Sequence, residues 1–183
     1  MNRRLLVLGA VMLILVMAGS AGASLIGDTV TVAHVYGTTN LYGPQDTVVA
    51  AGDGDVVAVY IGGTHEYNVN VEAYSINTIF TVNLAWSNRP SFNGLVVGSL
   101  DDSSGNPLQG VTIDTNMSGW DVSRLYYSDD QVKFNWKGLS FTTDTYFNAS
   151  LDFGQNAVPI PGALWLLGSG LLGLVAVRRR QKG

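Results

Sequence analysis

The sequence predicts an all-β protein whose central part folds as an antiparallel β-sandwich. Two stretches, QVKFNWK at 131–137 and TYFNASLDF at 145–153, alternate apolar and polar residues with the period of two that a half-buried strand requires. Clusters rich in Gly, Pro, Asn and Asp, such as AGDGD and DDSSGNP, separate further short apolar runs. Roughly eight to ten strands at this spacing favour a two-layer sandwich with jelly-roll or Greek-key wiring, and a closed barrel is the alternative.

The remaining strands are weaker and are expected in chain order between turn clusters. They are TVTVAHVY from Thr29, DVVAVYIG from Asp55, EYNVNVEAYSI from Glu66, FTVNLAWS from Phe80, GLVVGSL from Gly94, GVTIDTN from Gly110 and RLYYS from Arg124. In FTVNLAWS the alternation places Phe80, Val82, Leu84 and Trp86 on one face. The segment YGPQD is expected to be a turn because it combines Gly and Pro. Large inward side chains such as Trp86, Phe134, Trp136 and Phe147 are interpreted as core.

Residues 1–23 have the composition of a secretory signal peptide. Arg3 and Arg4 precede an apolar run at 5–18, and Ala21 and Ala23 supply the small residues that signal peptidase accepts before Ser24. The sequence therefore predicts export through the Sec translocon and cleavage before Ser24. An uncleaved membrane anchor is the alternative, although the apolar run is shorter than the ~20 residues of a typical span.

The predicted ectodomain, residues 24–157, is strongly acidic. It carries fourteen acidic side chains against four basic ones, a net charge of −10. Because nucleic-acid binding depends on Lys and Arg neutralising phosphates, this balance argues against a nucleic-acid partner. The chain has no cysteine, which excludes disulfides, thiol nucleophiles and thiolate metal sites.

Residues 158–183 have the layout of a membrane-associated tail. Pro159 and Pro161 precede an uncharged run at 162–177, which would form a helix about 24 Å long, slightly shorter than a ~30 Å hydrocarbon core. Basic residues follow at Arg178, Arg179, Arg180 and Lys182, and they favour a cytoplasmic end with the β-domain outside. These features alone fit either a permanent single-pass anchor or a substrate of a membrane transpeptidase.

The order of parts in this tail resembles the PEP-CTERM sorting signal. The similarity covers the motif Val158, Pro159, Ile160 and Pro161, the apolar run with Trp165 and Gly168-Ser169-Gly170, and the arginines. It implies recognition by an exosortase, an inner-membrane-anchored precursor, and delivery to the cell surface or extracellular matrix of a Gram-negative bacterium. It also implies association with exopolysaccharide or biofilm. The commonest form of the motif has Glu where this chain has Ile160, which leaves the exosortase subtype open.

The expected function is therefore that of a non-enzymatic structural protein of the surface or matrix, sorted by its tail. A carbohydrate-binding module delivered in the same way is the alternative, and exposed rings near turns at Tyr42, Trp120, Tyr126 and Tyr127 would stack on sugars. A hydrolase is a third reading. The histidines His34 and His65 match no zinc motif, since HEYNV lacks the second His of HExxH, and the chain has no GxSxG elbow.

No cofactor is expected, with calcium as the one alternative. Paired aspartates occur in three turn clusters, and Asp101 and Asp102 in DDSSGNP are the best candidates to donate oxygens to Ca²⁺. The other pairs are Asp53 with Asp55 and Asp129 with Asp130. None has the spacing of an EF-hand loop, and aspartate is also common in ordinary turns, which is the favoured interpretation.

Overall fold

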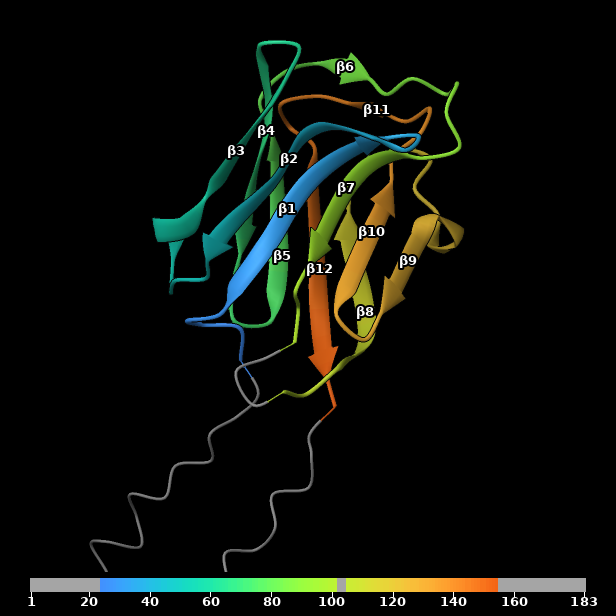
Figure 1. Cartoon of the computed structure of the whole chain (residues 1–183). Helices are drawn as coiled ribbons and strands as arrows, with labels where there is room; N and C mark the ends of the chain where they lie inside the picture. Colours follow the sequence, from blue (N-terminus) through green and yellow to red (C-terminus); the bar gives the residue numbers. More distant parts are fainter. Residues whose placement is uncertain (1–23, 102–104, 155–183) are drawn as a thin grey trace, which may run out of the picture.

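The computed structural model, which describes residues 24–101 and 105–154, is a sandwich of two five-stranded antiparallel sheets (Figure 1). Sheet A runs in the order β2 (Thr39–Val48), β1 (Thr29–Tyr36), β7 (Asn93–Gly98), β10 (Gln131–Asn135) and β9 (Leu125–Ser128). Sheet B runs in the order β3 (Val57–Ile61), β4 (Thr64–Val71), β5 (Ser75–Phe80), β12 (Tyr146–Phe153) and β8 (Leu108–Thr115). The predicted all-β sandwich is confirmed.

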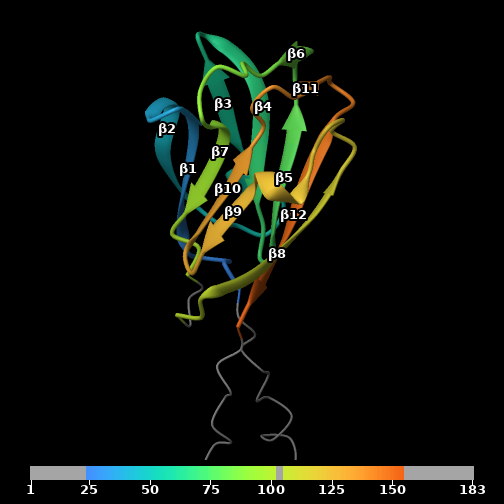
Figure 2. The ribbon, with the colours of Figure 1, turned by 90° about the vertical axis from the view of Figure 1, so that its right-hand side faces the viewer.

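The connections alternate between hairpins within a sheet and crossings between the sheets. Strands β3, β4 and β5 follow one another as a meander, and β9 and β10 form a hairpin. The chain crosses between the sheets after β2, β5, β7, β8 and β10. A small ladder of β6 (Leu84–Ala85) and β11 (Ser140–Phe141) lies at one end of the sandwich, as Figures 1 and 2 show.

An aromatic cluster fills the space between the sheets. Trp136 is fully buried and stacks on Trp86 with ring centroids 5.9 Å apart. Tyr67, Phe80 and Phe147 pack edge-on against Trp136 at 5.3 to 5.5 Å. The alternating residues of β10 and β12 supply much of this core, because Val132, Phe134, Phe147, Ala149, Leu151 and Phe153 all point inward. The prediction that these side chains form the core is confirmed.

The expected turn at YGPQD is wrong, because Tyr42–Asp46 lies inside strand β2. This strand pairs only with β1 and is an edge strand of sheet A, so the missing N–H of Pro44 does not interrupt a ladder on both sides. The register shifts on either side of His34 and Tyr42 mark a bulge. Gly43 has a φ of 69°, and a Cβ there would meet the carbonyl oxygen of Val32.

Two other strand predictions need correction. The segment FTVNLAWS is not one strand: β5 ends at Phe80, β6 contains only Leu84–Ala85, and Leu84 is exposed. Trp86 is nevertheless buried, because its backbone bonds Leu139 and Gly138 rather than a long strand. The segment EYNVNVEAYSI divides into β4 and β5, with a tight reversal closed by the hydrogen bond from the Glu72 amide to the Ser75 carbonyl.

The two ends of the described module lie at the same end of the sandwich, opposite β6 and β11 (Figures 1 and 2). At this end the Leu25 amide donates to the Ala73 carbonyl and the Gly154 amide donates to the Pro107 carbonyl. Within the described residues, no helix is both long and apolar enough to span a bilayer. The helices expected in the leader and the tail fall outside these residues.

Candidate functional site

The outer face of sheet A carries an open trough over the β9–β10 hairpin. Strand register places Tyr126 opposite Lys133 and Ser128 opposite Gln131, while the intervening Val132 and Phe134 enter the core. The four paired side chains therefore share the outward face. The trough has a volume of about 510 Å³ and is lined by Ser91, Phe92, Tyr126, Tyr127, Ser128, Gln131, Lys133 and Asn135.

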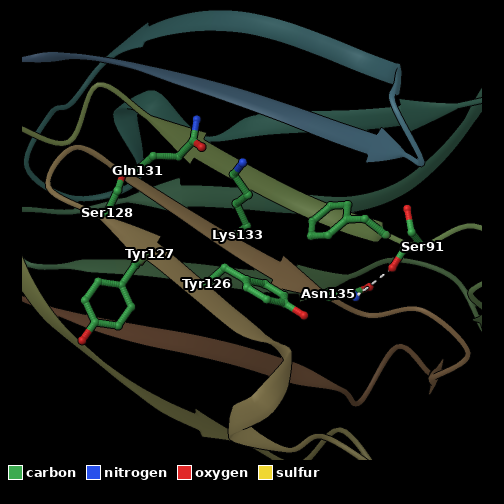
Figure 3. A pocket seen from close by; sticks show the side chains of 8 residues that line it. Ser91, Tyr126, Tyr127, Ser128, Gln131, Lys133 and Asn135 are labelled. Carbon is green, nitrogen blue, oxygen red and sulfur yellow. Dashed lines mark hydrogen bonds between the residues drawn. The ribbon is translucent and has the colours of Figure 1, made fainter.

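Two features of the trough stand out in Figure 3. The Tyr126 ring extends along the trough toward Asn135, whereas the Tyr127 ring points away from it. Lys133 lies next to Tyr126, and its amine points away from the Tyr126 ring, toward the side of the trough that carries Gln131. Hydroxyls and amides of Ser128, Gln131 and Asn135 complete the lining. The surface thus offers the exposed Tyr126 ring, the partly exposed Phe92, one cation and the neutral hydrogen-bonding groups of Ser91, Ser128 and Gln131, a mixture suited to an amphipathic polar ligand.

The wall formed by residues 91–93 is fixed to the end of β10 by the Asn135 side chain and by a backbone hydrogen bond from the Trp136 amide to the Asn93 carbonyl at 2.9 Å. Asn135 is buried although its position in β10 faces outward. Its Oδ1 accepts from the amides of Asn93 and Lys137, each at 3.2 Å, and its Nδ2 donates to the Ser91 carbonyl at 3.4 Å. This fixation brings residues 42 and 44 positions apart in the chain to the same site.

The start of β9 is held in place by Arg124 and Asp121. The Arg124 guanidinium donates to the backbone carbonyls of Asn135 at 3.3 Å and Lys137 at 2.8 Å. Asp121 accepts from the Ser123 amide at 2.9 Å, and hydrogen bonding with Ser123 lowers the pKa of its carboxyl. These contacts tie the strand that carries Tyr126 to the end of β10, so the ring is positioned by backbone contacts rather than by a free loop.

At two positions beside the trough, β7 carries glycine and so presents no side chain. Gly94 and Gly98 pair with Asn135 and Gln131 across the β7–β10 ladder, so no side chain rises from these positions. A Cβ on Gly94 would meet the carbonyl oxygen of Phe134, which belongs to the backbone and has little freedom to move. A Cβ on Gly98 would meet the Thr31 hydroxyl at 2.9 Å, and a side chain can rotate away.

Gly94→Ala is therefore expected to lower the free energy of unfolding by about 1–3 kcal/mol through overpacking. Gly98→Ala is the matched control and should cost less, because its first contact is a rotatable hydroxyl. Urea denaturation of the two variants and the parent chain measures both effects. Equal losses at the two positions would contradict the assignment of the Gly94 contact to the rigid backbone.

The other aromatic candidates have structural roles. Trp120 is half-buried and packs edge-on against Phe147 with centroids 4.5 Å apart, so it closes the core. Tyr42 packs partly against the core and donates its hydroxyl to Gln45 Oε1. Of the four rings proposed to stack on sugar, the structure brings only Tyr126 and Tyr127 to the trough.

The described residues contain no group of three or more His, Asp or Glu side chains arranged to hold a metal ion. The calcium pair is only half described, since Asp101 is exposed and Asp102 lies outside the described residues. Two other candidate aspartates serve their own turns: Asp55 accepts from the Ala50 amide at 3.0 Å, and Asp130 accepts from the Ser128 hydroxyl at 3.3 Å.

Sequence reasoning missed a buried polar network around His34. The His34 ring is fully buried and its Nδ1 lies 2.7 Å from the Tyr67 hydroxyl. Its Nε2 lies 2.9 Å from Asn93 Oδ1, and the amide nitrogen of Asn93 donates to the Ser87 carbonyl at 3.2 Å. This chain assigns the proton to Nε2 of a neutral imidazole. Burial lowers the pKa of His34 to about 4.

The two histidines do not form a common site. His65 hydrogen-bonds Asn68 Oδ1 at 2.8 Å and stacks on Tyr60, whereas His34 is enclosed between the sheets. The remaining sequence-based sites are the cleavage residues Ala21 and Ala23, the motif at 158–161 and the arginines at 178–180. All lie outside the described residues, and of the expected cleavage point only Ser24 is described.

The fold and the trough define an all-β sandwich module with an open polar face on one sheet. Comparison of the chain with protein-family models, with curated proteins and with solved structures found no match.

Proposed function

We propose that the protein is an exported, non-enzymatic component of the bacterial surface or extracellular matrix, delivered by its C-terminal tail to an exosortase. The observation that carries this proposal is the order of parts at residues 158–183, namely the Pro-x-Pro motif, the uncharged run and the arginines. The basic end favours a cytoplasmic location for the tail and an external location for the sandwich. Exopolysaccharide or biofilm matrix is the proposed destination.

The architecture of the module supports this role. Strand β12, the last strand before the tail, ends on the side of the sandwich opposite β6 and β11 (Figure 1). A tail attached at this end would leave the outer faces of both sheets accessible. Of the two histidines in the sequence, His34 is enclosed in the core and cannot reach a substrate, which supports a non-enzymatic role.

Deletion of residues 158–183 is expected to release the sandwich into the periplasm or the medium. Cell fractionation and intact-mass measurement compare it with the parent chain, which should lose the tail during sorting. Unchanged surface retention of the truncated chain would contradict the proposal.

A motif variant distinguishes sorting from simple anchoring. Replacing both Pro159 and Pro161 by Ala keeps the apolar run and the arginines, so a permanent anchor should behave as before. Under the sorting proposal, this variant accumulates in the inner membrane with its tail intact. Ile160→Glu is the matched control, because it changes the same motif toward its commonest form and should still be processed.

The trough favours a second and compatible function, carbohydrate binding. Its mixture of an exposed tyrosine ring, hydroxyls, amides and one amine corresponds to the apolar faces and hydroxyl edges of sugars. Its volume of about 510 Å³ lies within the usual range of ligand sites.

A further inference from the structure

We propose that the trough binds a polysaccharide segment in which carboxylate-bearing sugars are set between neutral ones. In this site Tyr126 stacks on a sugar ring and the Lys133 amine pairs with a sugar carboxylate. The inference rests on the proposed carbohydrate-binding function and names its ligand class and its binding residues.

The position of Tyr126 supports ring stacking. About half of the surface of this residue is exposed, 52%, although β9 is fixed at its start by Arg124. A ring held on a strand loses little conformational entropy on binding, and tyrosine combines an apolar face with a polar tip. The neighbouring Ser128 and Gln131 present a hydroxyl and an amide on the same face, where sugar hydroxyls would lie.

The position of Lys133 supports a carboxylate ligand. Within the described residues Lys133 forms no ion pair, and its side chain lines the trough opposite Tyr126 in the β9–β10 pair, with its amine directed toward the side of Gln131 (Figure 3). All four basic residues of the acidic ectodomain occur in the two segments that build the trough: Arg89 before Ser91, then Arg124, Lys133 and Lys137 along the β9–β10 region. Arg124 is already used by backbone carbonyls, which leaves Lys133 as the cation that lines the trough.

The charge pattern along the trough also limits the ligand. Asp129 and Asp130 form the β9–β10 turn beside Ser128 and Gln131, at the opposite end from Ser91 and Asn135. A ligand with a carboxylate on every sugar would place negative charge next to these aspartates, in a module that already carries −10 overall. Carboxylates separated by neutral sugars avoid this repulsion while still reaching Lys133.

The test measures binding by the full chain, kept soluble in a polyoxyethylene detergent that has no sugar head group. The probes are hyaluronan, which alternates a uronate with a neutral sugar, polygalacturonate, which has a carboxylate on every sugar, and neutral dextran. Affinity gel electrophoresis and titration calorimetry should show saturable binding to hyaluronan that is at least about tenfold tighter than to dextran, because one charge-assisted contact is worth about that factor. Polygalacturonate offers the same contact but should also bind more weakly than hyaluronan, because its further carboxylates lie next to Asp129 and Asp130.

Two variants locate the site. Tyr126→Ala should weaken hyaluronan binding about tenfold, as expected for a central aromatic contact. Lys133→Gln should weaken it by a similar factor and remove the preference for hyaluronan over dextran. Tyr74→Ala and Lys137→Gln are the matched controls, because Tyr74 is an exposed tyrosine away from the trough and Lys137 does not line it, and neither should change binding.

The possible failures are distinguishable. Absence of binding to all three probes would overturn both the carbohydrate-binding function and this inference, while the sorting proposal would stand on its own test. Equal binding to dextran and hyaluronan would support the carbohydrate-binding function but overturn the inference that the ligand carries carboxylates. Tighter binding to polygalacturonate than to hyaluronan would overturn the inference that neutral sugars separate the charged ones in the ligand. Hyaluronan binding unaffected by Tyr126→Ala or Lys133→Gln would overturn the assignment to the trough.

Discussion

Replacing Trp136 by Ala is expected to lower the free energy of unfolding by about 3–5 kcal/mol. The indole is fully buried and is the ring around which the aromatic cluster is built. It stacks on Trp86 and contacts Tyr67, Phe80 and Phe147 edge-on, with centroid distances between 5.3 and 5.9 Å. Its removal leaves a cavity between two sheets whose hydrogen-bonded strands cannot close over it. The loss is measured by urea denaturation followed by circular dichroism.

Trp136→Phe is the matched control for this prediction. The indole Nε1 of Trp136 is buried and has no hydrogen-bond partner among the described residues. Phenylalanine keeps an aromatic ring in the cluster and also removes this unsatisfied donor, so part of the lost packing is offset. We expect a loss below about 2 kcal/mol for Trp136→Phe. A Trp136→Ala variant as stable as the Phe variant would contradict the central role of this ring.

Alternation predicted the strands whose two faces differ most. QVKFNWK and TYFNASLDF correspond to β10 and β12, because each strand has one face in the core and the other outside. TVTVAHVY coincides with β1 even though His34 lies on its buried side. In FTVNLAWS the alternation does not reflect one strand. Phe80 ends β5, whereas Trp86 lies in the segment after β6, and each is buried from its own position in the backbone. Local periodicity does not reveal where a strand ends if the chain beyond it also buries apolar residues.

The edge strand β2 was not predicted from the sequence, for a different reason. Its exposed side chains give no hydrophobic pattern, and Gly43 and Pro44 have the composition of a turn. Only the sheet position explains them, because an edge strand tolerates proline and a bulge there discourages pairing with another chain. The order of strands in a sheet depends on long-range contacts, which the local pattern of a single sequence does not disclose.

The candidate binding site was predictable only in part. Tyr126 and Tyr127 were candidates for sugar stacking because they precede a turn, and both border the trough, although only the Tyr126 ring extends along it. Lys133 appeared only as an outward residue of an alternating strand. Its importance depends on the pairing with Tyr126 and on the segment at Ser91, which Asn135 holds against β10. The contact between Asn135 and Ser91 joins residues 44 positions apart in the chain, which local sequence patterns do not reveal.

Acidification is expected to destabilise the fold through His34. The centroid of the His34 ring lies 4.6 Å from that of Trp86, and the ring accepts a hydrogen bond from the Tyr67 hydroxyl. A second proton on the ring would remove that hydrogen bond and place a charge in the core. Burial therefore lowers its pKa from 6.5 to about 4. The unfolded chain binds the proton more readily than the folded one. The contribution of neutral His34 to the free energy of unfolding is therefore complete above about pH 6.5 and is lost as the pH falls toward 4. The full loss is about 3 kcal/mol.

The free energy of unfolding measured at intervals between pH 7 and 4.5 tests this prediction. His34→Gln should flatten the decline, because the amide can still accept from Tyr67 and donate to Asn93 but does not titrate in this range. Burial raises the pKa of Glu66, which acts in the opposite direction, since protonation at low pH relieves the cost of burying its charge. Glu66→Gln should therefore make the decline steeper. An equal decline in the parent chain and the His34→Gln variant would exclude His34 as its cause.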